Sequence, residues 1–247
     1  MKNRSRSFRL VLPALLFSVA AVPSAAQNRM TFKVGESAAT QSAVKSENVS
    51  KGHNVAQRET PEDLDELNFI EMVNSVPLDN KSAELIRKFQ EKEGRNRLFS
   101  REYNSKNNCT VETFRNKEVL LVTIPAASLF APNATELRPD AAALLAPLKR
   151  YLKDPDMYRV LMVMHTDNTG SEAYRDHLTE ERSKAVADWY ADQGADTTYL
   201  FPYAFGDDMP LVENNSMGNR ERNRRLEVYL VPGKKMLEQA KKGRIVF

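Results

Sequence analysis

An apolar run, a polar loop and an amphipathic helical pattern follow one another over residues 158–190, and this stretch constrains the fold most. Tyr158–Met164 has the length and apolar character of a buried strand. Apolar residues then recur at helical spacing, at Tyr174, Leu178, Ala185, Val186 and Trp189. Asn168 and Ser171 are both candidates to cap this helix. Asp167 is therefore predicted where a strand's carboxyl end meets a helix's amino end, a common ligand position in open α/β layers.

The flanking segments extend this pattern into alternating strands and helices. Further strands are predicted at Glu118–Ile124, Tyr199–Phe205 and Leu226–Leu230, which carry β-branched and aromatic residues. A helix is predicted from Pro139 up to a stop at Asp154-Pro155. Because strands alternate with helices, the predicted fold class is α/β, with a sheet covered by helices.

Residues 1–26 have the parts of a secretory signal peptide. Basic residues come first, an apolar core runs from Leu10 to Val22, and small residues lead up to Ala26. The core is shorter than the ~20 residues that cross a bilayer, so we expect cleavage after Ala26 instead of a retained anchor. No cysteine follows the core, which argues against a lipoprotein anchor. The half that follows lacks the alternation of lipid-facing strands, so no membrane barrel is expected there.

The chain between the signal peptide and the folded domain divides into two parts. Residues 27–59 are polar with sparse apolar side chains, which predicts a flexible tether. Residues 60–110 hold two short helical patterns, one starting at Thr60 and one from Lys81 to Lys92. These helices either pack on each other, pack on the main domain or dock a partner, and the sequence leaves the three alternatives open. The folded domain is placed at residues 111–232 and a basic tail at residues 233–247.

The charge balance argues against a nucleic-acid partner. The chain has 36 Lys and Arg against 33 Asp and Glu. Residues 1–26 contain four of the basic residues and no acidic ones, which leaves 32 against 33 after cleavage. The predicted mature protein is near neutral, and the basic residues near its C-terminus are interpreted as a solvated face and tail.

Few residues suit catalysis or metal binding. The three histidines, His53, His165 and His177, form no metal-ligand spacing such as HExxH, and no GxSxG segment is present. His165 is interpreted as a packed or capping residue. The helix side that carries Tyr174, Leu178 and Trp189 is interpreted as core. Cys109 is the only cysteine and is interpreted as an inert or surface thiol, with intermolecular pairing left open. We expect no cofactor and no metal ion.

Four polar motifs occur at the ends of the predicted strands and helices. They are His165-Thr166-Asp167-Asn168-Thr169-Gly170, Leu178-Thr179-Glu180-Glu181-Arg182, Gly206-Asp207-Asp208-Met209-Pro210 and Asn223-Arg224-Arg225-Leu226-Glu227. In this order they closely resemble the C-terminal, peptidoglycan-binding domain of the outer-membrane protein A (OmpA) family. The resemblance covers about Val111 to Val231. It implies a two-layer sandwich with a mixed β-sheet, in a periplasmic protein associated with the cell wall or the outer membrane.

The resemblance also implies a ligand, the diaminopimelate of the peptidoglycan stem peptide, bound by Asp167 and Arg182. A carboxylate suits the ammonium group of this ligand, and the planar fork of a guanidinium suits its carboxylate. The other residues expected around the ligand are Thr166, Asn168, Thr169, Gly170, Arg175 and Arg224. Arg175 stands where many members have Asn, so its charge would either strengthen carboxylate binding or change the preferred stem peptide. The opposed interpretation is a purely structural Asp167–Arg182 ion pair.

Three functions are compatible with these features. The first is non-covalent binding of peptidoglycan, which links the wall to the outer envelope. The second is an adaptor or scaffold whose helical region binds an outer-membrane or periplasmic protein, with weak or altered wall binding. A wall hydrolase ranks last. A homo-oligomer is left open.

Overall fold

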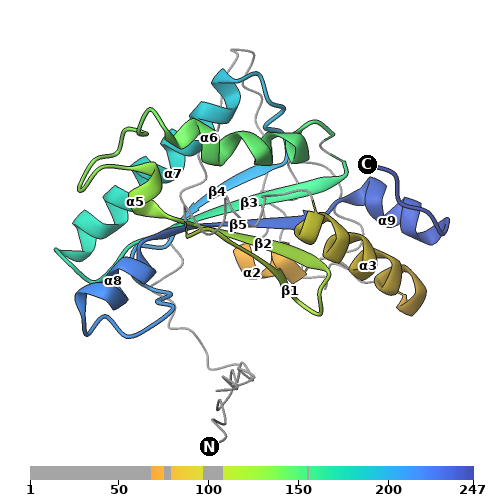
Figure 1. The fold of residues 1–247 in the computed structure, drawn as a ribbon, viewed down its shortest axis with the longest axis horizontal. Helices are drawn as coiled ribbons and strands as arrows, with labels where there is room; N and C mark the ends of the chain where they lie inside the picture. The colour runs from red at the N-terminus through yellow and green to blue at the C-terminus, as the bar shows by residue number, and fades with distance from the viewer. Residues whose placement is uncertain (1–67, 75–78, 97–107, 155) are drawn as a thin grey trace, which may run out of the picture. The chain divides into compact units, whose positions relative to one another are not determined.

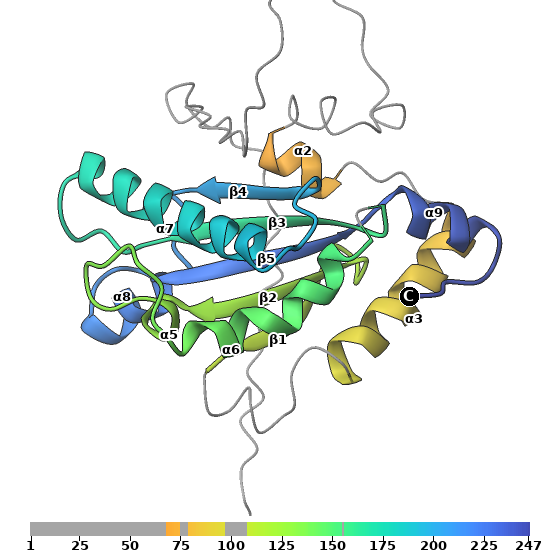
Figure 2. The ribbon, with the colours of Figure 1, turned by 90° about the horizontal axis from the view of Figure 1, so that it is seen from above.

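The computed structural model describes residues 68–74, 79–96, 108–154 and 156–247 (Figures 1 and 2). Their core is a five-stranded sheet in the order β1-β2-β5-β3-β4. Its strands are β1 (Thr110–Phe114), β2 (Val119–Pro125), β3 (Tyr158–His165), β4 (Leu200–Ala204) and β5 (Arg225–Pro232). Only the β3–β4 pair is parallel among these strands, so the predicted mixed sheet is confirmed. The predicted signal peptide, the tether and the start of the first helix lie outside the described residues.

Strand β1 was not predicted from the sequence. It is a five-residue edge strand with four exposed residues, so it shows no alternation of apolar and polar positions. A turn through Arg115, Asn116 and Lys117 joins it to β2, and all three residues have positive φ angles between 45° and 68°. Left-handed backbone at non-glycine residues is uncommon, which explains why this turn carries no recognisable sequence signal.

Helices α5 (Ala126–Leu129), α6 (Ala141–Leu145) and α7 (Glu172–Asp192) lie with the 3₁₀ helix η2 (Ala146–Leu152) against one face of the sheet (Figures 1 and 2). The helix predicted between Pro139 and Asp154 is therefore divided into an α-helical and a 3₁₀ part. Pro147 stands at the start of the 3₁₀ part. Because proline has no backbone N–H, it cannot continue the α-helical hydrogen-bond pattern.

The opposite face of the sheet is covered by α2 (Phe69–Asn74). Met72 and Val73 of α2 are buried there. The ring of Phe69 makes edge-to-face contacts with Tyr203, Phe205 and Tyr229, with centroids 5.2–5.5 Å apart. This geometry is favourable for aromatic pairs. The described part of the helical region thus packs on the main domain, and docking of a partner by its outer surface stays a prediction.

Helix α3 (Asn80–Asn96) joins the same domain through buried polar contacts. The fully buried amide of Gln90 donates to the carbonyl of Glu118 at 3.0 Å and accepts from the hydroxyl of Tyr158 at 3.1 Å. Buried polar groups are costly unless paired, so these contacts fix the position of the helix.

The C-terminal residues belong to the fold as well. Residues 234–241 form helix α9, in which Met236 and Ala240 are buried. Phe247 stacks on Tyr151 with centroids 5.6 Å apart. The basic residues of this segment are exposed, as predicted, while Met236, Ala240 and Phe247 attach residues 233–247 to the folded domain. The exposed lysines of α9 concealed its apolar side, which faces α3.

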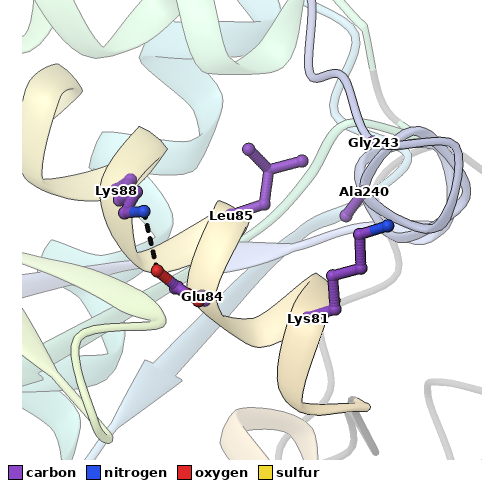
Figure 3. A pocket seen from close by; sticks show the side chains of 6 residues that line it. All are labelled: Lys81, Glu84, Leu85, Lys88, Ala240 and Gly243. Atoms are coloured by element: carbon purple, nitrogen blue, oxygen red, sulfur yellow. Dashed lines mark ion pairs between the residues drawn. The ribbon is translucent and has the colours of Figure 1, made fainter.

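A groove of about 190 Å³ runs between α3 and α9 (Figure 3). It is lined by Lys81, Glu84, Leu85, Lys88, Ala240 and Gly243. The groove lies at the end of the sheet where β5 finishes and β3 begins, because Pro232 pairs with Tyr158. Asp167 follows the other end of β3, so this groove is separate from the predicted ligand site.

Cys109 is buried in the core on the face of the sheet that α5, α6 and α7 cover. Burial raises the pKa of its thiol to about 11, which keeps it protonated and unreactive at neutral pH. The inert-thiol interpretation is confirmed, and the surface-thiol alternative is wrong. Among the described helices, none combines the length and the apolar character needed to cross a bilayer.

Candidate functional site

Asp167 lies directly beyond the carboxyl end of β3. Every residue of β3 is buried, and the backbone N–H of Thr166 continues the pairing by donating to the carbonyl of Gly206 at 2.8 Å. The chain then turns sharply, with the N–H of Thr169 donating to Oδ1 of Asp167 at 2.7 Å. Gly170 has a φ of +90°, which favours glycine. This turn holds the carboxylate of Asp167 in place with 3% of the residue exposed.

Helix α7 starts immediately after this turn. Ser171 is its N-cap and accepts a hydrogen bond from the N–H of Tyr174 at 3.3 Å. Of the two predicted caps, Ser171 is therefore the one used, while Asn168 is exposed in the turn. The amino end of α7, α5 and α8 (Met217–Asn223) gather at one end of the sheet (Figures 1 and 2).

The carboxylate of Asp167 forms an ion pair with the guanidinium of Arg224, which follows α8. Burial on its own would raise the pKa of Asp167, but hydrogen bonds from Thr169 and Arg224 outweigh it and hold the pKa below its ordinary 3.8. Asp167 is therefore ionised at neutral pH. The side chain of Arg224 is 39% exposed, so the pair is open to solvent on one side.

Arg182 is placed close to this pair but does not form an ion pair with Asp167. Its Nε donates to the carbonyl of Ala134 at 2.8 Å and its Nη2 to that of Ala131 at 3.3 Å. Its guanidinium carbon lies 4.8 Å from the centre of the Phe130 ring. These contacts fix Arg182 with only 4% of it exposed. The predicted structural ion pair between Asp167 and Arg182 is absent, because Arg224 takes that place.

Burial lowers the pKa of Arg182, and the nearby charge of Arg224 acts in the same direction. Within the described part of the chain, no carboxylate lies within ion-pair distance of Arg182, and its Nη1 donates no hydrogen bond. Arg224 thus pairs with Asp167 and also interacts electrostatically with Arg182. We call Asp167, Arg182 and Arg224 the open cluster.

Arg175 holds the loops of this site together. Its Nε donates to Oδ1 of Asp207 at 2.6 Å, and its Nη1 donates to the carbonyl of Gly170 at 2.7 Å. The two roles considered from the sequence both required a charge available to the ligand. In the structure the charge of Arg175 is paired with Asp207, and both of its roles at the ligand stay predictions.

Two features of the site were missed in the sequence. The first is the loop of residues 131–134, in which the carbonyls of Ala131 and Ala134 hold Arg182. The residue types of this loop carry no signal for that role. The second is Tyr174, which was assigned to the core side of its helix. It is 41% exposed, and its hydroxyl donates to Oδ1 of Asn133 at 3.1 Å.

A second charged cluster lies next to the first, formed by His165, Arg225, Glu227 and Tyr229; we call it the sealed cluster. Oε1 of Glu227 accepts from Nε of Arg225 at 2.7 Å, and Oε2 accepts from the hydroxyl of Tyr229 at 2.7 Å. Arg225 also donates to the carbonyls of Asn223 and Met209. All four members are at most 7% exposed.

His165 is the least satisfied member of the sealed cluster. Its Nε2 lies 3.3 Å from Oε2 of Glu227, but neither ring nitrogen has a well-aligned hydrogen-bond partner. Burial lowers the pKa of His165, and the contact with Glu227 offsets this only in part. The residue is 1% exposed, so its interpretation as a packed residue is confirmed. Among the described residues, no three His, Cys, Asp or Glu side chains are grouped as metal ligands.

The fold and the open cluster define a mixed α/β domain with a group of charged side chains at one end of its sheet. The sequence profile of the OmpA family matches residues 129–224, and this part of the chain is an OmpA-like domain. The match covers all three members of the open cluster.

Individual relatives agree with this assignment. The outer-membrane lipoprotein YfiB of Pseudomonas aeruginosa is 32% identical over 104 residues, which are 42% of this chain and 61% of YfiB. The peptidoglycan-binding protein ArfA of Mycobacterium tuberculosis is 30% identical over 99 residues, which are 40% of this chain and 30% of ArfA. The chain thus spans less than two thirds of the length of either relative.

A solved structure shares the fold. The crystal structure of a MotB-like protein from Desulfovibrio vulgaris superposes with a TM-score of 0.52 and 28% sequence identity. The match covers 61% of this chain and 95% of that protein. The structural match is longer than the match to the family profile, which agrees with the strands and helices that flank residues 129–224 in this chain.

Proposed function

We propose that this protein binds peptidoglycan non-covalently, by holding the diaminopimelate of a stem peptide in the open cluster. The observation that carries the proposal is the unmatched guanidinium of Arg182 beside the Asp167–Arg224 pair. A buried cation without a carboxylate partner is costly, and a ligand carboxylate would compensate for it.

The charges of diaminopimelate suit this arrangement. One end of the molecule has an ammonium group and a carboxylate on the same carbon. Asp167 would accept hydrogen bonds from the ammonium, and Arg182 would bind the carboxylate through its unused Nη1. Arg224 is exposed enough to move and to share its charge between Asp167 and the ligand. The exposed backbone of residues 168–170 borders the same position.

The relatives support binding at the cell wall. ArfA is named as a peptidoglycan-binding protein and YfiB as an outer-membrane lipoprotein. Together with the predicted signal peptide, these names favour a periplasmic protein that links the wall to the outer envelope. No positive feature favours catalysis, since His165 is buried away from solvent.

The adaptor function is the weaker candidate. The apolar residues Met72 and Val73 of α2 are already buried on the sheet, and α3 is fixed through Gln90. A protein partner would therefore have to bind outer surfaces of these helices. The groove between α3 and α9 is one such surface (Figure 3).

The decisive experiment measures retention of the purified protein on isolated sacculi. Asp167→Asn removes the charge that binds the ammonium, and Arg182→Lys removes the guanidinium fork. Loss of one partner of a desolvated charge pair costs on the order of 2–5 kcal/mol, so each variant should lower affinity well over tenfold.

The control is Arg222→Lys, a matched change at an exposed residue of α8. It should bind as the wild type does. Thermal unfolding of all variants separates binding from folding, since the Asp167 and Arg182 variants should remain folded. Retention of folded Asp167→Asn and Arg182→Lys at the wild-type level would refute the proposal.

A further inference from the structure

Tyr174 bridges two loops directly beside Arg182. Its ring lies against Gly170, where an added Cβ would come within 2.8 Å of Cδ1. Its hydroxyl reaches Asn133, which lies between the two residues whose carbonyls hold Arg182. An electrostatic interaction with Tyr174 acts to raise the pKa of Arg182, in keeping with side chains that lie near each other. Tyr174 and Asn133 thus lie side by side at the loop that holds Arg182, and we call this pair the wall.

This wall offers a hydrogen-bond donor and an acceptor side by side. The hydroxyl of Tyr174 donates to Oδ1 of Asn133, so its oxygen keeps a lone pair for another donor. The Nδ2 of Asn133 makes no hydrogen bond among the described residues, and both residues are exposed. Asn133 is held in this orientation by a left-handed backbone with φ of 59°.

A free donor next to a free acceptor complements a peptide group, which has one C=O and one N–H. In a stem peptide, the methylene chain of diaminopimelate leads from the charged end to such a peptide group. Free diaminopimelate has a second charged centre there instead. The wall would therefore distinguish the two ligands, although both carry the end that the open cluster binds.

We propose that Tyr174 and Asn133 form a specificity subsite that binds the backbone amide of the stem peptide, so that the site prefers peptide-linked over free diaminopimelate. This inference rests on the proposed function. A site that pairs both polar atoms of an amide discriminates against a ligand that leaves those protein groups unpaired. The subsite contributes selectivity, while Asp167 and Arg182 contribute the charge recognition.

The test compares the affinities for two ligands by calorimetry, a soluble muropeptide with a stem tripeptide and free meso-diaminopimelate. Tyr174→Phe removes the acceptor and keeps the ring against Gly170. Asn133→Gly removes the donor and tolerates the positive φ. Each variant should weaken muropeptide binding about five- to tenfold, as expected for one lost hydrogen bond, and change binding of the free amino acid less than about twofold.

Tyr190→Phe is the matched control on the same helix. It removes a buried hydroxyl that donates to the carbonyl of Leu145 at 2.9 Å, far from the wall. This variant should lower the unfolding midpoint without changing either affinity. The Tyr174 and Asn133 variants should keep the wild-type unfolding midpoint and lose affinity for the muropeptide.

The outcomes separate this inference from the proposed function. If the wild type binds both ligands and the two wall variants weaken both equally or neither, the subsite is refuted while the proposed function stands. If the wild type binds neither ligand nor sacculi, the proposed function itself fails. A selective loss of muropeptide binding in both variants supports the subsite.

Discussion

The open and sealed clusters lie next to each other on the same chain segments, yet they balance their charges differently. In the sealed cluster both carboxylate oxygens of Glu227 have donors, and Arg225 is shared between a carboxylate and two carbonyls. In the open cluster Arg182 has carbonyls but no carboxylate among the described residues, and Arg224 reaches solvent. Charged groups whose partners all lie within the protein stabilise a fold, whereas a charged group without an oppositely charged partner is a candidate to bind a ligand.

The difference follows from the position of each cluster relative to the carboxyl end of β3. His165 is the last residue of β3 and lies opposite Arg225 in the sheet, under the aromatic ring of Phe205. Asp167 lies two residues further, beyond the last strand pairing, where loops replace the covering layer. Two residues of chain thus separate the sealed cluster from a carboxylate whose partner, Arg224, is 39% exposed.

The largest expected effect on stability is that of Glu227→Gln. Removing this charge leaves Arg225 buried without a carboxylate, which should lower the free energy of unfolding by about 3–5 kcal/mol. Denaturant titration measures it, with the exposed Glu221→Gln as control. Sacculus binding per folded molecule should not change. A variant as stable as the wild type would show that the sealed cluster is not a stabilising unit.

Acid should act mainly on the sealed cluster. Burial on its own would raise the pKa of Glu227, but contacts with His165, Arg225 and Tyr229 outweigh it and bring the pKa from 4.5 to about 2. The stabilisation is complete above pH 4.5 and is lost as pH falls towards 2, by about 3 kcal/mol.

His165 acts in the same direction, because its pKa lies below 6.5 and protonation of the folded state is disfavoured. Unfolding measured across this range should therefore show a steady loss of stability with acid. The loss between pH 4.5 and 2 should be smaller in Glu227→Gln. An identical pH profile for the variant and the wild type would contradict the assignment of this titration to Glu227.

Tyr229→Phe should have a smaller effect. It removes one hydrogen bond to an ionised carboxylate and should lower the free energy of unfolding by about 1.5–2 kcal/mol. The double variant with Glu227→Gln tests the coupling, since the two losses should not add if both residues belong to one unit. Additive losses would mean that Tyr229 acts independently of Glu227.

The smallest effect on stability is expected from Arg224→Gln. Its side chain is 39% exposed, and Asp167 keeps the hydrogen bond from Thr169, so the unfolding free energy should fall by less than about 1 kcal/mol. Sacculus retention should nevertheless drop, while the control Arg222→Gln changes neither quantity. A stable variant with unchanged retention would show that Arg224 does not take part in binding, and Arg182 would then be the arginine that binds the ligand.

The sequence predicted the parts of the fold that follow a regular pattern. The apolar run at 158–164 became β3, and the helical spacing after Ser171 became α7. Edge strand β1, helix α8 and helix α9 were missed. Four of the five residues of β1 are exposed, the buried residue of α8 is the polar Asn223, and the exposed lysines of α9 obscure its buried Met236 and Ala240.

Prediction of the site depended on family motifs as well as on pattern. The position of Asp167 at the strand end follows from sequence alone, and the structure brings Arg182 and Arg224 to it. Which arginine pairs with Asp167 could not be predicted, because the choice depends on how α8 and β5 place Arg224, the single residue between them. The role of Tyr174 was also hidden, since its helical spacing is the same as that of the buried Leu178.

The sequence by itself determined the strands and helices that have regular apolar spacing, the residue types of the site and the position of Asp167, because these depend on periodicity and on neighbours along the chain. Tertiary structure alone decided which charges are matched. Arg182 meets carbonyls 48 and 51 residues away, and Arg224 meets a carboxylate 57 residues away. Pairing over such separations is set by how the sheet and its loops bring distant segments together, and no local pattern in the chain records it.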